Sequence, residues 1–361
     1  MILQDSYTED WINHFRSTPE YRRINPPVVE KMIHALGLLE KLSETGFDFI
    51  FKGGSSLILL LDRYQRFSID IDIITTQPTE ELEKALKDIV NGKPFTSFKL
   101  DQERIRNEKI PKSHYDVFYN SSLNPIASIT LDVLFEESPY PVITERVITS
   151  QWINTTEPYR SIKIPDIDSI LGDKLTAFAP ITIGVPYYRH ERSMATEIIK
   201  QLFDIAILLD HSKDILTVFQ SFRLVAENQM QYRGVSLSMD QVFEDIFQTS
   251  LIIARRDRND AETYKKYFQE LQQGITAFNQ FLIAGSFRIE DAVRAAGKTA
   301  WLASILRTEN FNGFKRYEQS RELNDAEIKN VSFNFLNRLK RTDMEAFYYW
   351  YQALMLVNLS D

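Results

Sequence analysis

The sequence KGGSSLILLLDRYQRFSIDIDII, residues 52–74, decides how the rest of the chain is interpreted. Glycines and serines open this stretch, and two aspartates separated by one residue lie among isoleucines near its end. The aromatic run before it, residues 47–51, is typical of a short strand, and residues 55 to about 64 are typical of a helix begun by serines. The alternating run SIDIDII, residues 68–74, indicates a second strand. We therefore predict the order strand, glycine turn, helix, strand.

A strand with this alternation points every second side chain to the same face. Ser68, Asp70 and Asp72 would therefore share one face, while the isoleucines between them face the core. Farther along the chain, the run SITLDVLF, residues 128–135, places Asp132 opposite its main apolar side chains. If the two strands are neighbours, three aspartates converge on one spot.

Carboxylates that converge repel one another, and either protonation or a cation relieves the repulsion. Oxygen ligands favour Mg²⁺ or Mn²⁺ over Zn²⁺, and two metal ions held by three aspartates suit in-line nucleotidyl transfer. The glycine turn lies where backbone N–H groups and a helix dipole can bind a phosphate. Its residues are Gly53, Gly54, Ser55 and Ser56. The alternative for the aspartates is a solvated strand face that binds nothing, and the alternative for the glycines is an ordinary tight turn.

The bulk composition limits the classes of function. The chain has 361 residues, no cysteine and a net charge of −8, so disulfides, thiolate catalysis and zinc–thiolate sites are excluded. The absence of cysteine fits a reducing cytoplasm, and no signal peptide or run of membrane-span length is present. A nucleic-acid partner would need a local basic surface. The run ARRDRND, residues 254–260, is one candidate, with a solvated face as the alternative.

The predicted secondary structure changes from strands to helices along the chain. Three strand-like runs follow one another between residues 95 and 137, and we expect them to be antiparallel neighbours. Beyond about residue 160, helical patterns fill nearly everything. We predict an α/β (α+β) domain with a mixed sheet over residues 1–160 and a mostly helical domain over residues 161–361.

Lys174 lies in the middle of the apolar stripe of a helix predicted over residues 164–180. A lysine there needs a partner, which a triphosphate or a carboxylate would provide, unless its stem carries the charge out to water. Another amphipathic helix is predicted over residues 193–210. Its pattern places Asp204 on the polar flank, as a solvated residue that pairs with Lys200.

The order of glycine turn, helix, D-x-D strand and later acidic strand resembles the polymerase-β-type nucleotidyltransferases, although their gap before the first aspartate is slightly shorter. More closely, FKGGSSL, residues 51–57, and RFSIDIDI, residues 66–73, resemble the AbiEii/AbiGii toxin family of nucleotidyltransferases. The segments around Lys174 and Asp204 resemble the second and third motifs of that family. The resemblance continues to about residue 210.

This resemblance implies a polymerase-β-like domain and an Mg²⁺- or Mn²⁺-dependent transfer of a nucleotide from an NTP to an acceptor hydroxyl. It also implies a cytoplasmic toxin of a toxin–antitoxin, abortive-infection and phage-defence system. The implied acceptor is the 3′ end of tRNA, whose modification blocks translation, and the antitoxin would be a separate protein. Two alternatives stay open: a nucleotidyltransferase that modifies a protein or a small molecule, and a non-catalytic NTP-binding module.

The same resemblance assigns roles to particular residues. Asp70 and Asp72 would be metal ligands, and Asp132 would be either a third ligand or the general base. Lys174 would neutralise phosphates, Asp204 would act near the acceptor, and the helical domain would contribute both to the site. The remaining nucleotide-binding positions are Lys52, Gly53, Gly54, Ser55, Ser56, Arg66 and Ser68. Arg66 has a simpler interpretation as a surface arginine paired with Asp62, one helical turn earlier.

Overall fold

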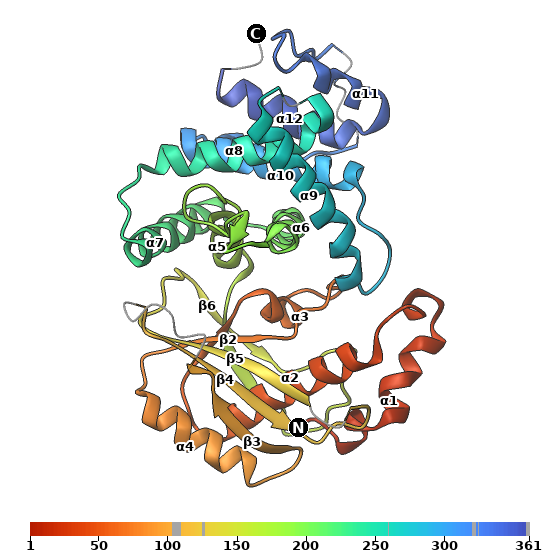
Figure 1. Ribbon diagram of the computed structural model, residues 1–361, viewed down its shortest axis with the longest axis vertical. Helices are drawn as coiled ribbons and strands as arrows, with labels where there is room; N and C mark the ends of the chain where they lie inside the picture. The colour runs from red at the N-terminus through yellow and green to blue at the C-terminus, as the bar shows by residue number, and fades with distance from the viewer. Residues whose placement is uncertain (103–109, 125–126, 259, 320–322, 324, 359–361) are drawn as a thin grey trace. The chain divides into compact units, whose positions relative to one another are not determined.

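The computed structural model describes residues 1–102, 110–124, 127–258, 260–319, 323 and 325–358. It divides into two compact units (Figure 1). The first comprises Met1–Asp166 and Phe281–Gly285, and the second comprises Ile167–Gln280 and Ser286–Asp361. The predicted α/β class is confirmed, since a sheet lies in the first unit and helices dominate the second. None of the described helices is long and apolar enough to span a membrane.

A mixed sheet of seven strands organises the first unit, in the order β3-β4-β5-β2-β1-β7-β6. Its strands are β1 Ile50–Lys52, β2 Ile71–Thr75, β3 Phe95–Leu100, β4 Lys112–Tyr119, β5 Ala127–Phe135, β6 Ile143–Val147 and β7 Ser161–Pro165. β2 runs parallel to β5 and β1 parallel to β7, while the other neighbours are antiparallel. Helix α2, Pro26–Glu44, contacts β5 and β7, and helix α4, Thr79–Val90, contacts β3. The parallel pairing makes neighbours of the two strands that carry aspartates.

The antiparallel arrangement predicted for residues 95–137 is confirmed by β3, β4 and β5. Residues 103–105 of the first run and residue 126 of the third lie outside the described residues. Along β5, Leu131 and Val133 are fully buried, while Asp132 between them is only half-buried. The period of two therefore separates the acidic face of this strand from its core face.

The segment between the glycine turn and β2 contains less regular structure than the sequence predicts. A 3₁₀ turn, Gly54–Ser56, leads into helix α3, Leu57–Leu60, which ends well before Tyr64. β2 begins only at Ile71. Ser68 and Asp70 therefore precede the strand, and the predicted strand start at residue 68 is wrong.

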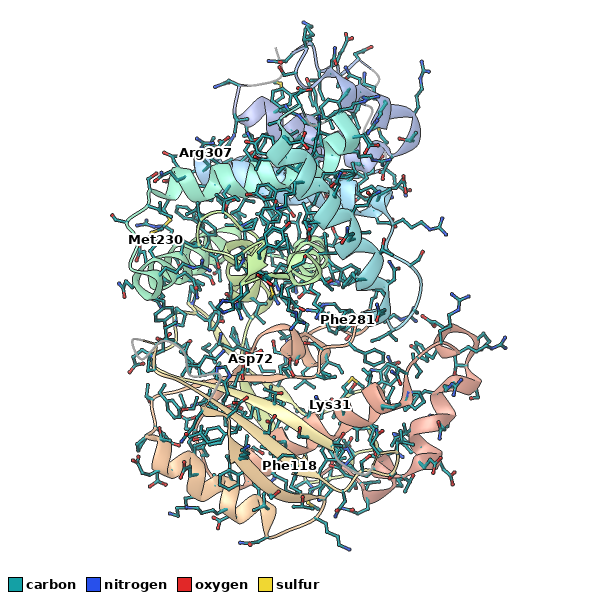
Figure 2. All side chains as sticks on the ribbon, in the orientation of Figure 1. Lys31, Asp72, Phe118, Met230, Phe281 and Arg307 are labelled. Carbon is teal, nitrogen blue, oxygen red and sulfur yellow. The ribbon has the colours of Figure 1, made fainter. Side chains whose placement is uncertain are left out.

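A distant segment pairs with the chain between α3 and β2. The amide of Phe67 donates to the carbonyl of Phe281, labelled in Figure 2, at 2.7 Å. The amide of Ile283 donates to the carbonyl of Gln65 at 2.9 Å. These bonds satisfy backbone groups of the irregular stretch between α3 and β2. Residues 281–285 thus belong to the first unit, although the chain on either side of them belongs to the second.

Helices make up most of the second unit. They include α5 Ile167–Ala177, α6 Ala195–His211, α7 Ile215–Arg233, α8 Met239–Arg255, α9 Glu262–Phe278, α10 Ile289–Thr308, α11 Leu339–Thr342 and α12 Met344–Leu356. α10 is buried along most of its length and contacts α6, α8 and α12. The helices predicted over residues 164–180 and 193–210 are confirmed as α5 and α6, with ends shifted by a few residues.

Gly172 allows the backbones of α5 and α7 to pack closely. A Cβ atom at this position would lie 2.6 Å from the carbonyl oxygen of Val218 and 2.7 Å from the amide nitrogen of Phe222. Both distances are shorter than van der Waals contact. Because the opposing atoms belong to a helix backbone, they cannot rotate aside as a side chain would.

The variant Gly172→Ala should therefore lower the midpoint of thermal unfolding, with an overpacking cost of about 1–3 kcal/mol. Gly92→Ala is the matched control, because the nearest atom to a new Cβ there is the carbonyl oxygen of Ile89, at 3.7 Å. Circular dichroism melting curves compare the two variants. Equal midpoints would contradict the close approach at Gly172.

Candidate active site

Asp72 and Asp132 lie side by side because β2 pairs in parallel with β5. The register makes them direct partners across the two strands. Asp72, labelled in Figure 2, is half-buried. Burial raises the pKa of the Asp72 carboxyl above its usual range, and the charges of Asp132 and Asp70 raise this pKa further. The convergence of Asp72 and Asp132 that the sequence suggested is thus present in the structure.

Two lysines oppose this rise in the pKa of Asp72. Lys52 on β1 is the register partner of Asp72 on β2. The charges of Lys52 and of Lys112 on β4 both lower the pKa of the Asp72 carboxyl. Burial and carboxylate repulsion outweigh them, so a further cation beside Asp72 would stabilise the ionised form of its carboxyl.

Asp132 is held by two side chains of β4 that the sequence analysis missed. Its Oδ2 lies 3.1 Å from Nζ of Lys112, and its Oδ1 lies 2.5 Å from Nδ1 of His114. His114 is also the direct register partner of Asp132. Alternation in KSHYDVFY, residues 112–119, puts Lys112 and His114 on one face, but only the register shows that Asp132 shares it. Both oxygens of the third carboxylate are therefore engaged.

The glycine turn packs directly against Asp72. Gly53 has a φ of +76°, in the left-handed region that favours glycine. A Cβ atom on Gly53 would lie 2.5 Å from Oδ2 of Asp72. The hydroxyl of Ser55 contacts Oγ of Ser68 at 2.9 Å and also the backbone carbonyl oxygen of Asp70. The turn, Ser68 and both aspartates of the D-x-D motif thus form one assembly.

Arg66 is buried beside this turn, so its interpretation as a surface arginine is wrong. It is 3% exposed, its Cζ lies 5.5 Å from the ring centre of Tyr64, and it donates to the carbonyl of Phe67 at 3.2 Å. A Cβ atom on Gly54 would lie 2.6 Å from a terminal nitrogen of Arg66. Since α3 ends at residue 60, Asp62 and Arg66 are not separated by a helical turn.

The helix after the glycine turn is too short to supply a large dipole. α3 has four residues, whereas the macrodipole builds up over successive turns. The hydroxyl of Ser56 donates to the carbonyl of Gly53 at 2.8 Å and so stabilises the turn itself. A phosphate bound here would therefore depend on backbone N–H groups and on the cations Lys52 and Arg66.

The donor atoms of this site suit a hard divalent cation. Asp70, Asp72 and Asp132 offer only carboxylate oxygens, which are the ligands that Mg²⁺ and Mn²⁺ prefer. In the described part of the chain, no three His, Asp or Glu side chains are arranged so that they could together hold a metal ion. Asp132 is engaged by Lys112 and His114 instead. The chemistry of the donor set fits a metal, and the ligand assignment stays a prediction.

Lys174 of the second unit is buried and paired with Asp204. Its Nζ lies 3.0 Å from Oδ2 of Asp204 and 3.1 Å from Oε1 of Gln201. The two charged side chains are 9% and 0% exposed. The sequence argument that a lysine on an apolar stripe needs a partner is confirmed, and the partner is a carboxylate.

The solvated position that the pattern of α6 predicts for Asp204 is wrong. Lys200, its expected partner, lies 2.8 Å from Glu197. A helical pattern describes the polarity of one helix, whereas α6 is covered by α5, α9 and α10. Lys174 and Asp204 belong to the second unit, so their contribution to a site with the aspartates of the first unit stays a prediction.

Removing one partner of the Lys174–Asp204 pair should destabilise the protein strongly. The variant Asp204→Asn leaves a buried ammonium group without its counter-charge, and breaking a buried pair in this way costs about 3–5 kcal/mol. The double variant Lys174→Met, Asp204→Leu removes both charges and should recover much of this loss. Urea unfolding measures the free energies of unfolding.

The control for this comparison is Glu197→Gln, which breaks the more exposed pair with Lys200. We expect it to change the free energy of unfolding by less than about 1 kcal/mol. If Glu197→Gln and Asp204→Asn cost the same, burial of Asp204 is not the source of the effect.

Comparison with known proteins gives the following matches. The family model described as "Nucleotidyl transferase AbiEii toxin, Type IV TA system" matches residues 38–284. Among solved structures, MenT4, a nucleotidyltransferase toxin from Mycobacterium tuberculosis H37Rv, is similar over 82% of this chain and 97% of that chain, with 13% sequence identity and a TM-score of 0.45. Comparison with curated proteins gives no match. Because the family model covers well over half of the sequence, the chain belongs to the AbiEii family of nucleotidyltransferase toxins of type IV toxin–antitoxin systems.

Proposed function

We propose that this nucleotidyltransferase moves a nucleotide from an NTP to the 3′ end of tRNA and so blocks translation. The observation that carries the proposal is the pairing of Asp72 with Asp132 on parallel strands, with the glycine turn packed against Asp72. A tRNA acceptor places the reaction in the cytoplasm. The antitoxin that a type IV system implies would be a separate protein.

Asp70 and Asp72 would hold Mg²⁺ or Mn²⁺, whose charge offsets that of the triphosphate. The hydroxyl oxygen of the acceptor would attack the α-phosphorus of the NTP. The bond from this phosphorus to the bridging oxygen of the β-phosphate would break, and pyrophosphate would leave. The proton of the hydroxyl would pass to a carboxylate acting as general base.

Asp132 is better suited than Asp204 to act as that base. The side chain of Asp132 is 19% exposed, so an acceptor hydroxyl could reach it, whereas Asp204 is fully buried against Lys174. A general base must lie within hydrogen-bond reach of the proton that it abstracts. Lys112 and His114 would act as positioning residues for Asp132. Asp204 would position Lys174 and need not touch the substrate.

The turn residues would bind the triphosphate. Their backbone N–H groups and the cations beside them supply donors and positive charge for phosphate oxygens. This set comprises Lys52, Gly53, Gly54, Ser55, Ser56, Arg66 and Ser68. Lys174 would add a further positive charge to the phosphates from the second unit.

Two other functions were compatible with the sequence. Membership of a nucleotidyltransferase family disfavours a non-catalytic NTP-binding module. Transfer to a protein or a small molecule differs from the tRNA proposal only in the acceptor. The assay below therefore separates the acceptors.

The purified protein should transfer label from an α-labelled NTP to total tRNA in the presence of Mg²⁺, and the treated tRNA should no longer support translation in vitro. Asp70→Asn and Asp72→Asn should reduce the rate by about a hundredfold or more, since each removes a charged ligand proposed to hold the metal ion at the reacting phosphates. Asp116→Asn, on strand β4, is the matched control and should retain activity. Label on protein, or on no acceptor at all, would refute the tRNA proposal.

The glycine turn offers a second test. Gly53→Ala should place a methyl group against Oδ2 of Asp72 and reduce transfer at least about tenfold, because small displacements of catalytic groups are costly. Gly46→Ala imposes the same backbone strain, since its φ is +78°, but its new Cβ atom meets no atom within 4 Å. Initial rates of the two variants are compared after their folding is checked by circular dichroism. Equal rates would show that contact with Asp72 does not matter.

A further inference from the structure

Arginines and phenylalanines gather at the C-terminal end of α8. Cζ of Arg255 lies 5.7 Å from the ring centre of Phe333. The Cζ atoms of Arg258 and Arg338 lie 5.9 Å and 6.0 Å from the ring centre of Phe335. We refer to these five residues as the Arg–Phe cluster. Two of its guanidinium groups thus share one aromatic ring, at distances typical of cation–π contact.

Like charges are crowded in the Arg–Phe cluster. Burial lowers the pKa of the Arg338 guanidinium, and the charges of Arg258 and Arg256 lower it further. Arg256 pairs with Glu290 at 3.2 Å. Within the part of the chain that the structure describes, neither Arg258 nor Arg338 has a carboxylate at ion-pair distance. Crowded cations are unfavourable unless an anion compensates them.

The basic character of this region is local. Residues 329–341 contain four basic residues and no acidic one, although the whole chain has a net charge of −8. In the other segment, residues 255–258, three arginines accompany Asp257, and residue 259 lies outside the described residues. Arg338 joins the segments by donating to the carbonyl of Ala254 at 3.5 Å. The fold therefore concentrates positive charge from two distant parts of an acidic chain.

The backbone at Arg256 is strained. Its φ is +54°, in the region that glycine favours, at the point where α8 ends. Strained residues are concentrated at binding sites. Arginines at a helix C-terminus also interact favourably with its dipole, which accounts for Arg255 and Arg256. Arg338 comes from a different element, the 3₁₀ helix Asn334–Arg338, and reaches the same helix end through the carbonyl of Ala254. The dipole does not account for the phenylalanine rings that lie among these arginines.

We propose that the Arg–Phe cluster is a docking surface for single-stranded nucleic acid. Guanidinium groups bind phosphates with paired hydrogen bonds, and bases stack on phenyl rings and on guanidinium planes. Arg258 is exposed and Phe335 is half-buried, so both chemical groups are within reach of a ligand. The accessible ring of Phe335 favours nucleic acid over an acidic protein, because a carboxylate would need only the positive charges, whereas the ring of Phe333 is buried. The proposal does not depend on the transfer reaction or on its acceptor.

Fluorescence anisotropy with a labelled single-stranded RNA of about fifteen nucleotides tests this surface, in EDTA and without NTP, so that no transfer occurs. The double variant Arg258→Gln, Arg338→Gln should weaken binding by about tenfold or more and reduce the slope of log affinity against log salt by about 1.4. Phe335→Leu should weaken binding by about fivefold or more and leave that slope unchanged.

Arg223→Gln is the matched control for the loss of an arginine. Cζ of Arg223 also lies 5.8 Å from a ring centre, that of Phe219. A terminal nitrogen of Arg223 lies 3.8 Å from the carboxylate of Glu227, which compensates its charge. It should bind RNA like the wild type. Thermal unfolding checks the fold of every variant, and Arg258→Lys with Arg338→Lys should keep the salt slope while losing affinity.

Three outcomes would overturn the proposal. The wild type could fail to bind RNA, or Arg223→Gln could lose as much affinity as the double variant. Alternatively, poly-L-glutamate could compete as well as RNA while Phe335→Leu has no effect, and the surface would then suit an acidic protein. Asp70→Asn should still bind RNA, which separates this result from a failure of the transfer assay.

Discussion

The parallel pairing of β2 with β5 is the constraint on which the first unit depends. Parallel neighbours cannot be joined by a tight hairpin, so the chain needs a long crossover. Here α4, β3 and β4 form that crossover, and β4 then extends the sheet beside β5. The same connection that sets Asp72 beside Asp132 therefore also brings Lys112 and His114 to Asp132.

The two units bury charge in different ways. In the second unit, Lys174 and Asp204 are buried as a pair of opposite charges 3.0 Å apart. In the first unit, burial is the main reason for the raised pKa of Asp72, and the charges of Asp132 and Asp70 raise it further against the opposing charges of Lys52 and Lys112. Groups held in such surroundings are typical of functional sites, because a ligand of opposite charge relieves the repulsion. The raised pKa of Asp72 is thus more informative about function than the Lys174–Asp204 pair.

Local patterns in the sequence predicted those features that depend on one element alone. Alternation identified the acidic face of β5, and the apolar stripe of α5 showed that Lys174 needs a partner. The burial of Asp204 could not be predicted in this way, because it depends on the helices that cover α6. The contact of His114 with Asp132 depends on strand register, which no single run of residues reveals. The early end of α3 at Leu60 coincides with pairing to residues that come more than two hundred positions later in the chain.

That late segment also affects the order in which the protein can fold during synthesis. Domains generally fold as units, with the N-terminal one first as the chain leaves the ribosome. The first unit here cannot be completed when residue 166 emerges, since Gln65 and Phe67 find their backbone partners only in residues 281–283. The fully paired form of the segment between the glycine turn and the D-x-D motif therefore arises only after much of the helical unit has been made. A growing chain of this toxin would pass most of its synthesis without a finished candidate active site.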